Sequence, residues 1–158
     1  MNYPPVRYLV LWLTTACNLR CRYCYRKEDD HAIMSKEVAR TALFLAAQSG
    51  LPFHIQLAGG EPTLEPDMIE FVGRTVRDAH WPATLAMQTN GTLWERDMIE
   101  LCRRYDIGIG VSVDGPPDVQ EALRGMSGAT FRSLSLFEKK HMPVRVTTVL
   151  SSLTSSPA

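Results

Sequence analysis

Three of the four cysteines are close together in the sequence, at Cys17, Cys21 and Cys24. A disulfide framework would have an even number of cysteines at wide spacing, which this group does not. Thiolates gathered in this way typically bind metal. A structural zinc ion would need a fourth ligand, for which His31 is the candidate. Three thiolates without a fourth protein ligand indicate instead an iron–sulfur cluster with one iron open to another molecule.

The fourth cysteine, Cys102, is in a different setting. It lies in an amphipathic run with Met98, Leu101 and Tyr105, whose apolar positions recur at helical spacing. Free cysteine is a small hydrophobic residue that is often buried. We therefore predict that Cys102 belongs to the hydrophobic core and binds no metal.

The composition is that of an ordinary globular protein. Its 158 residues are enough for one domain with a sizeable core, and 45% of them are hydrophobic and 22% charged. The 17 basic residues balance 17 acidic ones, so charge gives no argument for nucleic acid or a membrane as a partner. No apolar run reaches the roughly 18 residues of a transmembrane helix. The first residues do not resemble a secretory signal, and we expect a cytoplasmic protein.

Apolar runs and amphipathic stretches alternate along the chain. We predict strands at 8–13, 53–58, 84–89, 107–113 and 144–150, and helices at 36–48, 66–80, 95–105 and 131–140. Such alternation is typical of an α/β fold with parallel strands joined by right-handed crossovers. The predicted domain is 1–150, and the serine-rich residues 151–158 are expected to be a disordered tail.

Within the predicted strands, one set of alternating side chains is apolar and the other is small or polar. In the strand at 107–113, Gly108, Gly110 and Ser112 alternate with isoleucine and valine. A doubly wound sheet has helices on both faces and needs both faces to be apolar. The pattern therefore favours an open, incomplete (β/α) barrel with a ligand on its inner face. A polar face exposed to solvent would give the same alternation.

Turn-forming residues follow the predicted strands at their C-terminal ends, where ligands bind in βα folds. They are Gly59-Gly60-Glu61-Pro62, Asn90-Gly91-Thr92 and Asp114-Gly115-Pro116, and the cysteine loop follows the first strand. Two adjacent glycines would let a ligand approach backbone amides closely, and Glu61 would suit an ammonium group. Asp114 is interpreted as a residue that fixes its own turn.

Taken in this order, the motifs resemble those of radical S-adenosylmethionine (radical SAM) enzymes. Cys-Asn-Leu-Arg-Cys-Arg-Tyr-Cys-Tyr at 17–25 is similar to the family's cluster signature, and Gly-Gly-Glu-Pro at 59–62 to its motif for the SAM amino group. With Gln-Thr-Asn-Gly-Thr-Leu at 88–93 and Val-Ser-Val-Asp-Gly-Pro at 111–116, the chain most resembles the peptide and sulfatase maturases. Those usually carry a further C-terminal SPASM domain. The resemblance spans about residues 6–150.

The resemblance implies a [4Fe–4S] cluster held by Cys17, Cys21 and Cys24, with SAM on its open iron. The residues that it implies as SAM contacts are Tyr23, Gly59, Gly60, Glu61, Asn90, Ser112 and Arg124. Each has a plainer interpretation, since Tyr23 could be a core aromatic, Ser112 a small lining residue, Asn90 a turn cap and Arg124 a solvated cation. The implied reaction is reductive cleavage of SAM to a 5′-deoxyadenosyl radical that abstracts hydrogen from a peptide or protein. A flavodoxin or ferredoxin is the implied electron donor.

The number of strands departs from the family pattern. The family's core has six βα units, whereas we predict five strands here, so we expect a fragment or an unusually short member. Two other hypotheses stay open beside a radical SAM enzyme. One is a protein that binds the cluster and SAM without turnover, and the other is a structural zinc module that uses the cysteines and His31.

Overall fold

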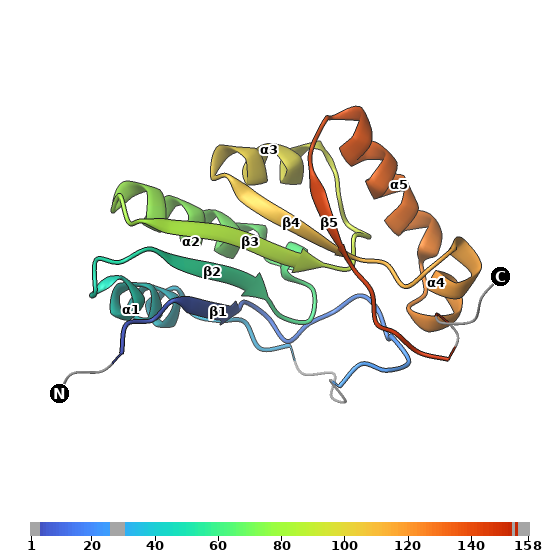
Figure 1. The fold of residues 1–158 in the computed structure, drawn as a ribbon, viewed down its shortest axis with the longest axis horizontal. Helices are drawn as coiled ribbons and strands as arrows, with labels where there is room; N and C mark the ends of the chain where they lie inside the picture. Colours follow the sequence, from blue (N-terminus) through green and yellow to red (C-terminus); the bar gives the residue numbers. More distant parts are fainter. Residues whose placement is uncertain (1–3, 26–30, 153, 155–158) are drawn as a thin grey trace.

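The computed structural model describes residues 4–25, 31–152 and 154. Five parallel strands form one sheet whose order follows the chain (Figure 1), and they are β1 (Tyr8–Trp12), β2 (Phe53–Ala58), β3 (Ala83–Thr89), β4 (Ile107–Ser112) and β5 (Val144–Thr147). β1 and β5 are the two edges of this sheet, so the barrel is not closed. The predicted α/β fold with an incomplete barrel is confirmed.

Helices follow the strands as expected, and Figure 1 shows most of them along one side of the row of strands. They are α1 (Lys36–Ala47), α2 (Pro66–Asp78), α3 (Arg96–Arg104), α4 (Pro117–Leu123) and α5 (Ser127–Lys139), with a 3₁₀ turn, η1, at Pro62–Leu64. Ser35 caps α1, since its side chain accepts a hydrogen bond from the Val38 amide at 3.2 Å. None of the helices in the described ranges is both long and apolar enough to cross a lipid bilayer.

Three elements differ from the prediction by more than two residues, and one of them is α5, which begins at Ser127, four residues before its predicted start. α4 was missed because 114–117 resembles a stop signal, whereas proline is also well suited to the first turn of a helix. β5 ends at Thr147, three residues before the predicted end. There the chain leaves the sheet, because the Thr148 hydroxyl donates to Val113 O at 2.6 Å and the Val149 amide donates to Asp114 Oδ1 at 3.0 Å.

The hydrophobic core lies between the helices and one face of the sheet. Ile55, Leu57 and Met87 are completely buried there, as the alternation of the strands predicted. Cys102 on α3 is also completely buried in this core, which confirms its prediction as a core residue. The helices therefore cover the apolar face, and the strands present their other side chains on the opposite face.

On that opposite face, polar and small residues lie side by side across the central strands. Gln56 is in register with Ala86, and Ala86 with Gly108. At the β1 edge, Tyr8 and Val10 are 58% and 50% exposed. This is the inner face of the partial barrel, and its small side chains leave room for a ligand near the strand ends.

The predicted tail at 151–158 falls mostly outside the described residues. Of its described part, the Ser151 amide donates to Thr154 Oγ1 at 2.6 Å. The domain boundary near residue 150 therefore stays a prediction.

Candidate functional site

A cavity of about 610 Å³ opens on the inner face of the sheet at the C-terminal ends of the strands. Its lining residues are Trp12, Cys17, Leu19, Cys21, Tyr23, Cys24, Tyr25, Ala58, Gly59, Gly60, Glu61, Gln88, Asn90, Ser112, Arg124, Thr147 and Val149. All ten residues predicted to hold the iron–sulfur cluster or to contact SAM line this one cavity. The lining residues that were not predicted include Trp12, Leu19, Tyr25, Thr147 and Val149. Trp12 and Thr147 are on strands whose alternation could have indicated them.

The three clustered cysteines are on the loop after β1. Cys17 and Cys21 are half-buried and Cys24 is exposed. The loop is anchored at one end of α4, since the Arg22 amide donates to Leu123 O at 2.9 Å. Burial raises the pKa of the Cys21 thiol, and the nearby positive charge of Arg124 opposes this shift.

The donor set of this loop fits an iron–sulfur cluster. Three thiols face a common cavity that also has space for a second ligand, as a cluster with an open iron requires. Within the described ranges, no three Cys, His, Asp or Glu side chains are grouped as ligands of a single metal ion. His31, the fourth ligand of the zinc hypothesis, is not among the residues that line the cavity.

Gly59 and Gly60 allow two stretches of backbone to touch. A Cβ atom on Gly59 would lie 2.5 Å from Thr14 O, and one on Gly60 would lie 2.1 Å from Ala16 O. The Gly60 and Glu61 amides donate to these same two oxygens, each at 2.8 Å. We expected the glycines to expose amides to a ligand. The structure uses these amides to hold the start of the cysteine loop instead.

The Glu61 carboxylate is completely buried and already has several hydrogen-bond donors. Oε1 accepts bonds from the amide and hydroxyl of Thr63 at 3.1 and 2.6 Å and from the Thr89 hydroxyl at 2.7 Å. Oε2 accepts one from the Asn90 amide at 2.7 Å. Burial raises the pKa of Glu61, and these hydrogen bonds oppose the shift. The carboxylate joins η1 to the end of β3, and its contact with an ammonium ligand stays a prediction.

Ser112 has its hydroxyl fixed by a neighbouring amide. Gln88 Nε2 donates to Ser112 Oγ at 2.9 Å, and the Thr147 hydroxyl donates to Gln88 Oε1 at 3.3 Å. Because Ser112 Oγ accepts the Gln88 bond, its own proton can be donated elsewhere. Gln88, Ser112 and Thr147 all line the cavity, so this row of polar groups can present a donor to a bound molecule.

Asp114 joins Tyr23 of the cysteine loop to Arg124 at the end of α4. Its Oδ2 accepts hydrogen bonds from the Tyr23 hydroxyl and from Arg124 Nε, and the guanidinium carbon of Arg124 lies 5.3 Å from the centre of the Tyr23 ring. Burial alone would raise the pKa of Asp114, but bonds from Tyr23, Val149 and Arg124 hold it below its ordinary value. We interpreted Asp114 as a turn residue from the sequence, and this wider role depends on residues far away in the chain.

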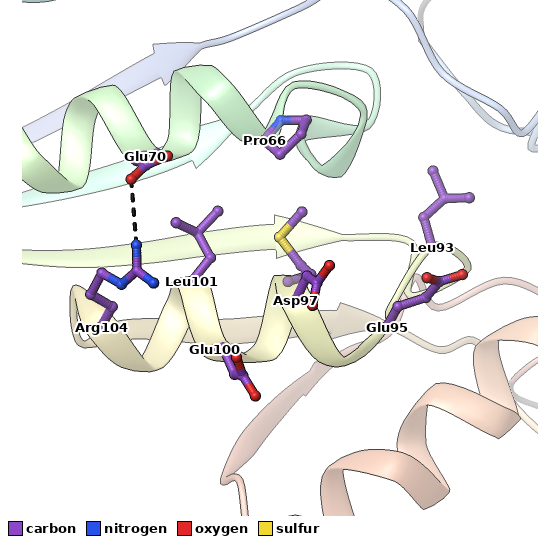
Figure 2. A pocket seen from close by; sticks show the side chains of 9 residues that line it. Pro66, Glu70, Leu93, Glu95, Asp97, Glu100, Leu101 and Arg104 are labelled. Atoms are coloured by element: carbon purple, nitrogen blue, oxygen red, sulfur yellow. Dashed lines mark hydrogen bonds and ion pairs between the residues drawn. The ribbon is translucent and has the colours of Figure 1, made fainter.

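A second hollow, of about 410 Å³, lies on the outer side of the fold between α2 and α3 (Figure 2). Glu70 of α2 faces Arg104 of α3 across it, with their charged atoms 3.5 Å apart. None of the residues predicted to do chemistry lines this hollow. We therefore assign the function to the cavity at the strand ends.

Comparison with protein families identifies the family of most of the chain. Residues 13–153 match the model of the Radical SAM superfamily. The matched region contains the cysteine loop, all five helices, β2 to β5 and every residue that lines the cavity except Trp12.

Among individual relatives, the AdoMet-dependent heme synthase of Methanosarcina barkeri is 34% identical over 153 residues, which cover 90% of this chain and 42% of the synthase. The GTP 3′,8-cyclase of Chlorobaculum tepidum is 32% identical over 110 residues, covering 69% of this chain and 33% of the cyclase. The solved structure of anSMEcpe with bound AdoMet and the Cp18Cys peptide has a TM-score of 0.83 and 25% identity, covering 96% of this chain and 45% of that one. The chain thus spans less than half the length of each of these proteins.

Proposed function

Because this chain belongs to the radical SAM superfamily, we propose that Cys17, Cys21 and Cys24 hold a [4Fe–4S] cluster and that the adjoining cavity holds SAM. The observation that carries the proposal is the meeting of all ten expected residues around one cavity of about 610 Å³. When bound, these cofactors supply radical chemistry, in which one electron cleaves a carbon–sulfur bond of SAM to give methionine and a 5′-deoxyadenosyl radical.

Both charged groups at the methionine end of SAM, the ammonium and the carboxylate, have matching groups in the cavity. With the amides of Gly60 and Glu61 already used and the Glu61 carboxylate buried, the 59–61 segment can serve the SAM ammonium group through its backbone carbonyls. Ser112 has a hydroxyl proton to donate, and Arg124, which bonds Asp114 through Nε, has further N–H donors on its terminal nitrogens. We assign Ser112 and Arg124 to the SAM carboxylate.

The apolar part of the cavity lining suits the remaining chemistry. Trp12, Leu19 and Val149 line the same space, and Tyr23 offers an aromatic ring on which adenine can stack. A dry surface of this kind protects an alkyl radical from side reactions with solvent. The residues of this chain therefore orient SAM and exclude water, while the cofactors carry the bond cleavage.

We further propose that the molecule from which hydrogen is abstracted is a peptide or protein, and that a flavodoxin or ferredoxin supplies the electron. The support for a peptide is the likeness to anSMEcpe, whose structure holds both AdoMet and a peptide. Relatives with similar or higher identity are named for heme synthesis and GTP cyclisation, so the substrate needs a direct test.

Cluster and SAM chemistry can be tested on the 158-residue chain after anaerobic reconstitution. We expect about four irons per chain and release of 5′-deoxyadenosine when SAM and dithionite are added. Replacing Cys17, Cys21 or Cys24 by alanine should abolish both. Cys102→Ala is the matched control, because this thiol is completely buried in the core, and it should keep the iron content of the unchanged chain.

The outcomes separate the three hypotheses. Iron and SAM binding without any 5′-deoxyadenosine would indicate a protein that binds the cofactors without turnover. One zinc ion per chain and no cluster would indicate the structural zinc module. Loss of iron in Cys102→Ala would contradict the assignment of the three-cysteine site. For the substrate, 5′-deoxyadenosine release that a peptide library stimulates, but porphyrins and GTP do not, would support peptide modification.

A further inference from the structure

Asn90, at the end of β3, has its side-chain amide beside the first cysteine of the loop. Its Nδ2 lies 3.9 Å from Cys17 Sγ and donates to Asn18 Oδ1 at 2.9 Å. Asn90 lines the candidate cavity, as expected of a SAM contact. Both N–H groups of its amide are directed at groups of the protein, one at an oxygen and the other at a sulfur.

The orientation of this amide follows from its partners. Asn90 Oδ1 accepts hydrogen bonds from the Thr92 backbone amide at 2.9 Å and from the Thr92 hydroxyl at 2.7 Å. A backbone N–H can only donate, so the atom that faces it must be the oxygen. The nitrogen of the Asn90 amide is therefore the atom that faces Cys17.

The backbone of Asn90 is held equally firmly. Its amide donates to Glu61 Oε2 at 2.7 Å, and its carbonyl accepts a bond from the Thr130 hydroxyl at 3.1 Å. The residue is 7% exposed. The amide can keep its place beside Cys17 without needing a ligand to order it.

We propose that Asn90 is a positioning residue that donates an N–H···S hydrogen bond to the Cys17 thiolate and thereby raises the reduction potential of the cluster. This inference rests on the proposed cluster at Cys17. Reduction adds negative charge to the cluster and its sulfur ligands, so a donor to sulfur stabilises the reduced form more than the oxidised form. The Leu19 backbone amide also donates to this sulfur, at 3.4 Å, and should likewise raise the reduction potential of the cluster.

The test is a potentiometric titration of the reconstituted full chain in the absence of SAM. The amount of reduced cluster at each potential is measured by EPR. A hydrogen bond with a net worth of about 0.5–1.5 kcal/mol corresponds to roughly a twofold to tenfold change in the ratio of reduced to oxidised cluster. In Asn90→Ala we expect that ratio to fall by such a factor at a fixed potential. A tenfold fall equals a shift of about 59 mV to lower potential for one electron. In Asn90→Asp, which keeps an acceptor for Thr92 but places negative charge near the sulfur, the fall should be larger.

Thr92→Val is the matched control. It removes the Thr92 hydroxyl, which donates to Asn90 Oδ1 and accepts a bond from Asn18 Nδ2 at 2.8 Å. It leaves the Thr92 backbone N–H that orients the Asn90 amide, and it leaves the Asn90 amide that faces the sulfur. We expect its potential to equal that of the unchanged chain. Equal potentials in all four proteins, or loss of the cluster from both Asn90 variants, would overturn the proposal. An unchanged chain that holds no cluster would contradict the proposed cluster site instead, so the two failures are distinguishable.

Discussion

The ion pair between Arg124 and Asp114 is buried beside the candidate site, with side chains 10% and 0% exposed and 2.7 Å between Nε and Oδ2. The same carboxylate accepts hydrogen bonds from Tyr23 and from the Val149 amide. Asp114 therefore ties together three segments that border the cavity: the cysteine loop, the end of α4 and the chain after β5. Because removal of one partner leaves the other charge without compensation inside the protein, this pair should matter more than a surface pair.

We predict that Asp114→Ala lowers the free energy of unfolding by about 3–5 kcal/mol, as breaking a buried ion pair typically does. Urea unfolding monitored by circular dichroism measures this. The matched control is Arg96→Ala, which breaks the exposed pair between Arg96 and Glu100 and should cause no measurable change. A similar loss of stability in both variants would mean that Asp114 has no special role.

The hydrogen bonds of the buried Glu61 carboxylate predict a structural effect when this residue is replaced. In Glu61→Ala, donors from Thr63, Thr89 and Asn90 would lose their acceptor inside the protein, and each unsatisfied buried group costs about 1–3 kcal/mol. We therefore predict a large loss of stability, together with loss of iron, because the 59–61 segment holds the start of the cysteine loop. Denaturant unfolding and iron analysis measure both effects.

Glu61→Gln separates support from ligand binding. It keeps one oxygen acceptor but has no charge, so it should retain most of the iron and a part of the stability that Glu61→Ala loses. If the carboxylate instead bound the SAM ammonium directly, Glu61→Gln would keep its iron and full stability and lose SAM affinity alone, as calorimetric titration would show.

A third prediction concerns the polar row at the inner face. Ser112→Ala removes the hydroxyl that we assign to the SAM carboxylate, and a hydrogen bond to a charged group is worth about 1.5–3 kcal/mol. We expect SAM affinity to fall roughly tenfold to a hundredfold with iron content unchanged. Gln88→Leu leaves the hydroxyl in place but removes its partner, and should weaken SAM binding less. Equal affinity in Ser112→Ala and the unchanged chain would remove Ser112 from the site.

Much of the fold was predictable because each strand carries its own alternation. The bounds of β2 were predicted fully, and the buried face was correct for Ile55 and Leu57, since burial of alternate residues depends only on local sequence. The cysteine spacing likewise indicated where the site would be. α4 could not be predicted with the same ease, because proline residues both end and begin helices.

The roles of individual site residues were harder to predict, because they depend on partners that are distant in the sequence. Glu61 receives a bond from Thr89, and Asp114 one from Tyr23, which is 91 residues away. Such pairs form only after the register of β2 with β3 and the path of the cysteine loop are fixed. The sequence shows a carboxylate next to two glycines, and only the folded chain shows that Glu61 also joins η1 to the end of β3.

The last prediction is a pH dependence of stability that belongs to Asp114. Its pKa in the folded chain lies below its ordinary value of 3.8, so the unfolded chain binds a proton there more readily than the folded one. This contribution is present above pH 3.8 and is lost as the pH falls through the lower, folded-state pKa. Asn at this position does not titrate. The difference in unfolding free energy between the unchanged chain and Asp114→Asn should therefore be constant near neutral pH and shrink on acidification, which urea unfolding between about pH 6 and about pH 3 measures. The pKa of Glu61 is shifted in the opposite direction, upward. Because Glu61 is present in both proteins, its contribution cancels and the comparison isolates that of Asp114. A difference that stays constant through this range would show that Asp114 titrates alike in the folded and unfolded chains and that its bonds to Tyr23 and Arg124 do not favour the ionised form.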